Sequence, residues 1–283
     1  MANEFNADDL LAFVHIEKAA GTTFIHILRR NFFLRYLDVR PYGIESGGLF
    51  LSGDLRISTR ILPGLKCFSG HAVTPYSDLG RPGKIKYITI MRDPVKRYLS
   101  QYQHWIEKKG LDVDFEDFLE IEELSNFQTR KYAGRDDLDE AKRRLQQEFL
   151  LVGYVEAYDE FLVLLRNRLA HMGFCINYEK QNLARNLVPV DTILKEYSEQ
   201  IVERNLNDIA LYQFVKDELF PGYKQDYPGD FQADFNDFIE SKDQIPFIQK
   251  AKSYLDYAFR KGYVEPVTGM IRLANGKPYK GSY

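Results

Sequence analysis

Residues 10–24 read LLAFVHIEKAAGTTF, and this stretch decides the fold expected of the chain. The apolar run at residues 10–16 is typical of a buried strand. Small residues follow it, and apolar side chains then recur at helical spacing from Phe24 to Phe32, so we expect a helix to begin at the turn. Strand, tight turn and helix form the opening unit of many nucleotide-binding α/β folds.

Further strands and helices follow along the chain. Apolar runs that predict strands recur at residues 66–68, 85–91 and 149–153. Helical patterns cover residues 156–169 and 191–220, the second with a break near Asn205. We therefore expect an α/β, P-loop-like, three-layer fold, in which helices flank a mostly parallel central sheet and a C-terminal helical extension follows.

The composition is that of an ordinary globular protein. Hydrophobic residues make up 45% of the 283 residues, enough for a sizeable core. We expect one domain, with a core at about residues 10–220 and a peripheral extension at about 221–283. The net charge is 38 − 41 = −3, so we expect neither nucleic acid nor an anionic membrane surface as a partner.

Cysteine use and the N-terminus indicate a cytoplasmic protein. Cys67 and Cys175 are too few for a disulfide framework or a structural zinc site. Residues 1–9 are acidic and lack the basic region of a signal peptide, and no stretch has the length and apolarity of a membrane span. No pair of histidines has metal-ligand spacing, so we expect no metal. The sequence leaves the oligomeric state open.

The turn after the first strand has the chemistry of an anion site. Proteins bind phosphate through backbone N–H groups at a helix N-terminus, through close approach of the main chain and through a cation. The turn consists of Lys18, Ala19, Ala20, Gly21, Thr22 and Thr23. It is not a Walker A loop, G-x-x-x-x-G-K-[ST], because its lysine precedes its glycine. The same residues could also form an ordinary turn beside a surface lysine.

A second candidate anion site follows the strand at residues 85–91. Arg92 lies at the carboxyl end of this strand, where ligands collect in doubly wound sheets. Asp93 and Pro94 favour the start of a helix, on which Ser100 lies about two turns further along. A guanidinium group and a hydroxyl that meet at one ligand would suit another phosphate. Taken singly, Arg92 could be a salt-bridged arginine and Ser100 an ordinary helix residue.

These two motifs resemble those of a known enzyme family. Residues 15–24, HIEKAAGTTF, resemble the 5′-phosphosulfate loop of carbohydrate sulfotransferases related to heparan sulfate 2-O-sulfotransferase, the sulfotransferase family 2 type. Residues 92–102, RDPVKRYLSQY, resemble the 3′-phosphate motif of the same family. Residues 126–130, NFQTR, and 152–156, VGYVE, extend the resemblance, which spans roughly residues 13–212.

The resemblance implies an enzyme that transfers a sulfuryl group from 3′-phosphoadenosine-5′-phosphosulfate (PAPS) to an acceptor hydroxyl and releases the diphosphate PAP, with no metal required. Lys18 and the loop at residues 19–23 would hold the 5′-phosphosulfate, and Arg92 with Ser100 would hold the 3′-phosphate. Lys18 would also stabilise the bridging oxygen of the leaving 5′-phosphate. One departure stands out: Glu17 occupies a position where the family commonly has proline. An acid there would weaken anion binding unless it points to solvent.

The resemblance also implies a catalytic base and an acceptor class. His71, after the strand at residues 66–68, matches the family's base, and histidine is suited to accept a proton near neutral pH. Asn126, Gln128 and Arg130 could contact the acceptor or the cofactor, or could be ordinary solvent-facing residues. The acceptor implied is a hydroxyl on a sugar or glycoconjugate.

Other acceptors and two other functions stay open from the sequence. For a cytoplasmic enzyme the acceptor could be a sugar precursor, a glycolipid head group or a hydroxylated natural product. A P-loop-like small-molecule kinase would need a magnesium-binding acid and a Walker A or kinase glycine loop, and neither is evident. A non-catalytic module would bind PAP or another nucleotide without transferring a group.

Overall fold

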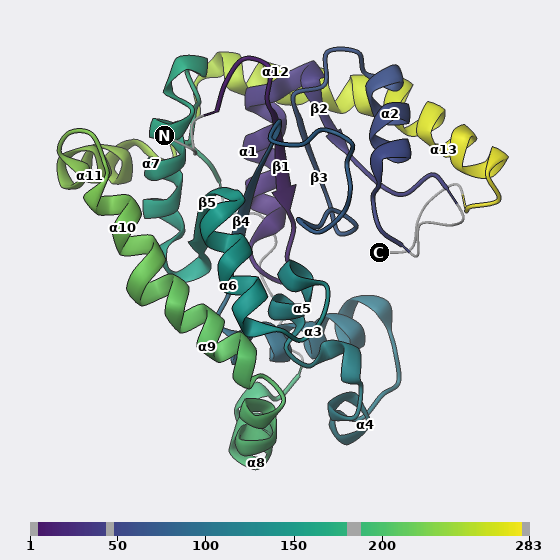
Figure 1. Ribbon diagram of the computed structural model, residues 1–283, viewed down its shortest axis with the longest axis vertical. Coiled ribbons are helices and arrows are strands. Elements are labelled where there is room, and N and C mark those ends of the chain that lie inside the picture. Colours follow the sequence, from purple (N-terminus) through teal and green to yellow (C-terminus); the bar gives the residue numbers. More distant parts are fainter. Residues whose placement is uncertain (1–4, 44–47, 180–187, 279–283) are drawn as a thin grey trace.

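A five-stranded parallel sheet forms the middle layer of the computed structural model, which describes residues 5–43, 48–179 and 188–278. The strands are β1 (Leu10–Val14), β2 (Tyr36–Asp38), β3 (Cys67–Gly70), β4 (Ile85–Met91) and β5 (Phe149–Tyr154). They lie in the order β2-β3-β1-β4-β5, and every neighbouring pair is parallel (Figure 1). All five residues of β1 are buried, as expected of a central strand covered on both faces.

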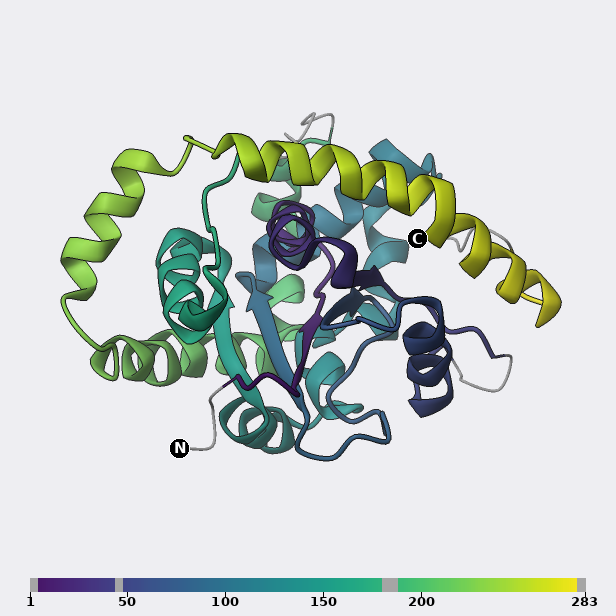
Figure 2. The ribbon, with the colours of Figure 1, turned by 90° about the horizontal axis from the view of Figure 1, so that it is seen from above.

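Helices cover both faces of the sheet. Those before β5 are α1 (Gly21–Phe32), α2 (Ser52–Ile61), α3 (Pro94–Lys109), α4 (Phe115–Leu119), α5 (Phe127–Ala133) and α6 (Leu138–Gln147). Those after β5 are α7 (Tyr158–Arg168), α8 (Val190–Glu203), α9 (Leu206–Phe214), α10 (Phe220–Gln225), α11 (Phe231–Ser241), α12 (Phe247–Phe259) and α13 (Glu265–Ala274). Helices α1 and α7 lie on one face, and α5 and α6 on the other (Figure 2). The predicted three-layer α/β fold is confirmed.

The strand order creates a switch point at β1. From β1 the chain runs to β2 and β3 on one side and then returns across β1 to form β4 on the other. Val14, the last residue of β1, pairs with Gly70 of β3 and with Thr89 of β4. The segments that follow these three strands therefore leave the same edge of the sheet, which is where ligands bind in open α/β sheets.

The short edge strand β2 was absent from the sequence-based prediction. Its three residues are too few for a recognisable apolar run, and its pairing depends on contacts made only in the fold. Arg29 of α1 forms an ion pair with Asp38, and the Tyr36 hydroxyl hydrogen bonds to Ser69 of β3. The predicted break between α8 and α9 near Asn205 is confirmed.

The expected C-terminal helices are present and pack against the core. Figure 2 shows α12 and α13 as one long helix across the molecule, with α12 along α1. Nη1 of Arg272 on α13 donates a hydrogen bond to the carbonyl oxygen of Pro41, at 2.6 Å. The helix leaves large apolar side chains exposed, among them Phe247, Ile248, Tyr254, Leu255, Met270 and Leu273. Residues 279–283 of the expected extension lie outside the described residues.

A buried carboxylate joins α5 to α9. Asp208 accepts hydrogen bonds from the N–H groups of Gln128 (3.0 Å) and Thr129 (2.7 Å) and from the Thr129 hydroxyl (2.8 Å). Its side chain is fully buried, and this burial raises its pKa against the opposing effects of Arg97 and the three donors. The start of α5 is therefore fixed by a carboxylate from a distant helix.

We expect Asp208→Asn to lower the free energy of unfolding by about 3 kcal/mol, because an amide N–H₂ group would face donors and leave them unsatisfied. Urea unfolding monitored by circular dichroism measures the change. Asp243→Asn, at an exposed position, is the matched control and should change stability by less than about 0.5 kcal/mol. Equal stability of the two variants would contradict the structural role of Asp208.

Candidate active site

A cavity of about 2020 Å³ opens where β1, β3 and β4 end. It exceeds the roughly 300–1,000 Å³ of an ordinary small-molecule pocket, so two substrates could occupy it together. The predicted site residues that line it are Lys18, Ala20, Gly21, Thr22, Thr23, His71, Arg92 and Ser100. Ala19 is buried and does not line it. The fold thus brings both predicted anion motifs and the predicted base to one cavity.

The loop between β1 and α1 has an unusual backbone. Lys18 (φ 66°) and Ala20 (φ 56°) both adopt the left-handed conformation, which is uncommon for residues other than glycine. Ala20 is the N-cap of α1, and no side chain caps this helix. Left-handed residues in a turn direct successive N–H groups into a concavity that suits an anion, and the helix N-terminus adds its partial positive charge. The loop therefore has the geometry of an anion site.

Arg92 connects the two anion motifs directly. Its Nη1 donates a hydrogen bond to the carbonyl oxygen of Lys18, at 2.9 Å. The side chain of Gln128 holds the main chain of Arg92 from both sides: Oε1 accepts from the Arg92 N–H (3.0 Å), and Nε2 donates to the Arg92 oxygen (2.9 Å). The ends of β1 and β4 thus form one hydrogen-bonded unit.

The electrostatics of this unit favour a polyanionic ligand. Burial lowers the pKa of the Lys18 ammonium group, and the nearby Arg92 cation lowers it further. Burial also lowers the pKa of Arg92. Two nearby, partly desolvated cations repel each other, and an anion bound between them would relieve this repulsion.

Helix α3 begins as predicted and supplies another wall of the cavity. Asp93 is its N-cap and accepts a hydrogen bond from the Lys96 N–H at 2.9 Å, and Pro94 is its first residue. The polar residues of α3 that line the cavity include Lys96, Ser100, Gln103, His104, Glu107 and Lys108. The hydroxyl of Ser100 and the guanidinium group of Arg92 thus share one cavity, as the sequence predicts.

His71 follows β3 directly and is held by several side chains. Its ring stacks on that of His15, with centroids 4.3 Å apart, and its Nδ1 lies 3.4 Å from Oε1 of Glu17. Its main-chain oxygen accepts a hydrogen bond from Lys131. Burial lowers the pKa of His71, Glu17 opposes this, and Lys131 adds to it. The imidazole is therefore neutral near pH 7, in the form that accepts a proton.

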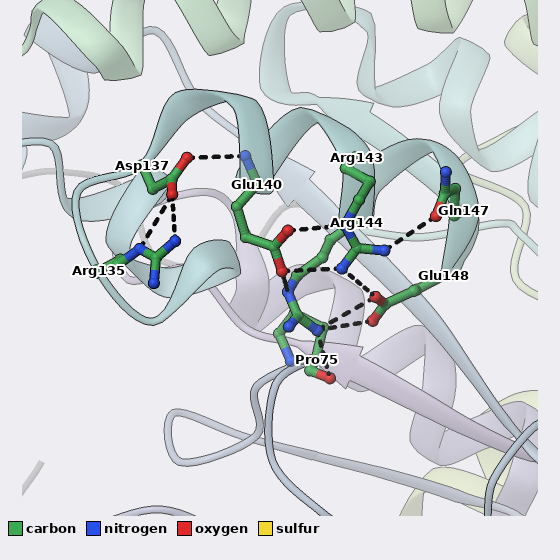
Figure 3. Close-up of polar contacts among 8 residues, drawn as sticks. All are labelled: Pro75, Arg135, Asp137, Glu140, Arg143, Arg144, Gln147 and Glu148. Carbon is green, nitrogen blue, oxygen red and sulfur yellow. Dashed lines mark hydrogen bonds and ion pairs between the residues drawn. The ribbon is translucent and has the colours of Figure 1, made fainter.

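The segment after His71 is anchored to α6. Arg144 donates a hydrogen bond to the carbonyl oxygen of Pro75 at 3.3 Å, and its guanidinium group pairs with Glu140 (2.7 Å) and Glu148 (3.1 Å) (Figure 3). These two carboxylates fix the arginine on the helix surface. The segment that follows His71 is therefore attached to α6, one of the helices on that face of the sheet.

The three residues predicted as possible acceptor contacts lie outside the cavity lining. Gln128 is fully buried, and its amide is used by Arg92. Oδ1 of Asn126 accepts hydrogen bonds from two N–H groups in the first turn of α9. Arg130 donates to the carbonyl oxygen of Ser125 at 3.0 Å. In this geometry all three support the segments around the site.

Sequence reasoning missed Lys131, which lies on α5 beside the predicted NFQTR segment. Its side chain is partly buried next to His71, and this desolvation lowers its pKa to about 8. No sequence signal distinguishes it from a surface lysine. Glu17 was recognised only as a departure from the family motif, whereas the structure places its carboxylate beside His71.

Within residues 5–43, 48–179 and 188–278, no group of three or more His, Cys, Asp or Glu side chains is placed to hold a metal ion. No helix in these ranges is both long and apolar enough to cross a bilayer. The cytoplasmic location stays a prediction of the sequence.

Comparison with known proteins finds relatives by sequence, although no family model matches the chain. Heparan-sulfate 6-O-sulfotransferase 1-A of Danio rerio is 34% identical over 117 residues, which is 36% of this chain and 28% of that protein. Heparan-sulfate 6-O-sulfotransferase 1 of Homo sapiens is 32% identical over 121 residues, which is again 36% of this chain and 28% of that protein. The match spans less than a third of these relatives.

The predicted resemblance to carbohydrate sulfotransferases is confirmed by these relatives, but its assignment to the 2-O type is not, because they are 6-O-sulfotransferases.

Two solved structures are also similar. A sulfotransferase from Alicyclobacillus acidocaldarius gives a TM-score of 0.37 at 16% identity, covering 72% of this chain and 97% of that one. Mouse sulfotransferase SULT7A1 complexed with PAP gives a TM-score of 0.43 at 13% identity, and the match covers 89% of this chain and 91% of that one. Both scores lie below 0.5.

We expect Gly21→Ala to weaken PAP binding by about 1–3 kcal/mol, because the new methyl group would overlap the imidazole of His15. His15 cannot turn aside easily, since it lies stacked between Phe13 (centroids 5.3 Å apart) and His71. Calorimetric titration with PAP measures the loss. Gly262→Ala, where the added carbon meets open space, is the control and should bind like wild type. Unchanged affinity in Gly21→Ala would show that the loop does not hold the nucleotide.

Proposed function

We propose that this chain is a PAPS-dependent sulfotransferase that transfers the sulfuryl group to a carbohydrate hydroxyl, with His71 as general base. The observation that carries the proposal is the hydrogen bond from Arg92 to the main chain of Lys18. It joins the two proposed phosphate-binding sites, each of which has a cationic side chain, in the cavity that His71 also lines. PAPS has phosphate groups at both ends of its ribose, so it needs two such sites at a fixed separation. The sequence similarity to heparan-sulfate 6-O-sulfotransferases supports this choice of donor.

Each end of the donor has a matching set of groups in the cavity. The backbone of residues 18–23 at the start of α1 suits the 5′-phosphosulfate, because N–H groups and the helix N-terminus both favour negative charge. Arg92 and Ser100 suit the 3′-phosphate, with charge-assisted hydrogen bonds from the guanidinium group and a further one from the hydroxyl.

The reaction follows from the positions of His71 and Lys18. The acceptor oxygen attacks sulfur in line with the bond to the 5′-phosphate, and His71 takes the hydroxyl proton as the new S–O bond forms. The bond between sulfur and the bridging oxygen breaks, and negative charge develops on the departing phosphate. Lys18 and the loop N–H groups stabilise that charge, as in related phosphoryl transfers.

The acceptor we propose is an acidic glycan of the glycosaminoglycan type. The cavity is large enough for a sugar chain beside the donor, and its wall carries carboxylates as well as further cations, Arg40 and Arg272 among them. Cationic side chains in a cleft attract and orient an anionic polymer. The names of the sequence relatives point to the same acceptor class.

We expect Ser100→Ala to weaken PAP binding about tenfold and to leave binding of 5′-AMP unchanged, because the lost hydroxyl contacts the 3′-phosphate alone. Arg92→Ala should weaken the binding of both nucleotides, since it also releases the carbonyl of Lys18. Calorimetric titration of each variant with PAP and with 5′-AMP separates these effects. Ser253→Ala on α12 is the control. An equal loss for both nucleotides in Ser100→Ala would contradict the assignment of the 3′-phosphate site.

We expect His71→Ala to lower turnover by about a hundred- to ten-thousandfold with little change in PAP affinity, because the general base is lost and the donor site is kept. The assay follows transfer from labelled PAPS to de-O-sulfated heparan sulfate. His171→Ala, at an exposed position, is the control. Near-normal turnover in His71→Ala would overturn the assignment of the base. If wild type binds PAP but transfers sulfate to no acceptor, a non-catalytic nucleotide-binding module becomes the better account.

A further inference from the structure

Glu17 is placed to act on His71. Its Oε1 lies 3.4 Å from His71 Nδ1, and both side chains are about a third exposed, at 36% and 31%. Glu17 also lines the cavity and directly precedes Lys18. The carboxylate therefore lies beside the proposed base, while its main chain belongs to the loop that carries Lys18.

Four charged or titratable groups face His71 from three segments. His15 stacks on it and Glu17 approaches it from the loop after β1, Lys131 approaches from α5, and Arg40 from the segment after β2. Burial lowers the pKa of His15 well below its usual value, so His15 stays neutral. Of these four groups Glu17 alone is anionic, and two of the others are cations. Without Glu17, the imidazolium formed during catalysis would keep its hydrogen bond to the main chain of His15, which also raises its pKa, but would lose the one anion among these four groups.

The contact also selects a tautomer. A carboxylate accepts hydrogen bonds and does not donate them when ionised. With Glu17 beside Nδ1, the neutral imidazole is favoured with its proton on Nδ1 and its lone pair on Nε2. Glu17 also raises the pKa of the nearby Lys131 ammonium group, against the larger effect of burial.

We propose that Glu17 is a positioning residue that holds His71 in the Nδ1-protonated tautomer and stabilises the imidazolium formed when Nε2 accepts the acceptor proton. The proposal rests on the proposed function of His71 as base. One proton moves from the acceptor hydroxyl to Nε2, while Nδ1 keeps its own proton and Glu17 stays ionised. This is the role that an acidic partner plays for a histidine base in general.

The first test observes the histidine itself. Protein labelled with ¹⁵N-histidine is titrated by NMR as wild type, Glu17→Gln and the control Glu240→Gln, which is an exposed position, and His71→Asn assigns the resonance. We expect the Nδ1-protonated tautomer in wild type and in the control. Glu17→Gln should give mixed tautomers and a titration midpoint at lower pH, because it removes the one group that raises the pKa of His71 by its negative charge. An unchanged tautomer and midpoint would overturn the proposal.

The second test measures catalysis with labelled PAPS and de-O-sulfated heparan sulfate. We expect Glu17→Gln to lower kcat about ten- to a hundredfold, which is less than the loss of the base itself, with KM for PAPS nearly unchanged. The acid limb of the pH–rate profile should move to lower pH, and Glu17→Asp should restore part of kcat. Loss of activity in Glu17→Gln with retained activity in His71→Ala would make Glu17 the base and overturn the proposal.

The two tests separate this proposal from the proposed function. If wild type transfers no sulfuryl group but His71 changes tautomer in Glu17→Gln, the sulfotransferase assignment fails and the Glu17–His71 interaction stands. If wild type is active and neither measurement changes, the role of Glu17 fails alone. The resonances of the other four histidines of the chain report whether each variant is folded.

Discussion

One hydrogen bond, from Nη1 of Arg92 to the carbonyl oxygen of Lys18, joins the two halves of the site. It depends on Gln128, which holds the main chain of Arg92, and Gln128 in turn depends on the buried carboxylate of Asp208. The chain of contacts runs from α9 through α5 to the ends of β4 and β1. The spacing of the two proposed anion sites is therefore set by contacts that reach into the core.

The site brings together groups that would avoid one another elsewhere in a protein. Lys18, Arg92 and Lys131 are cations whose pKa values are lowered, each chiefly by burial. Two residues of the loop also adopt left-handed backbone conformations that side chains disfavour. Such unfavourable desolvation and backbone conformations are typical of functional sites, and the packing of the sheet beneath the site offsets their cost in stability.

The sequence predicted the parts of the molecule whose cause is local. Four strands were recognisable as apolar runs, and the start of α3 was recognisable from Asp93 and Pro94. Both anion motifs and His71 were placed correctly at strand ends. Features that depend on a distant partner were not predicted. Gln128 and Lys131 lie on α5 and donate hydrogen bonds to the main-chain oxygens of Arg92 and His71, which follow β4 and β3. These contacts depend on where α5 packs, and no local sequence pattern predicts that.

The cavity also has a consequence for synthesis of the protein on the ribosome. Its wall includes side chains from the loop after β1 and, near the other end of the chain, Arg272 of α13. The carbonyl to which Arg272 is bonded lies 231 residues earlier. The central strand β1 likewise pairs only with strands made later. A nascent chain can therefore pair the strands of its sheet well before Arg272 is available to join the cavity wall.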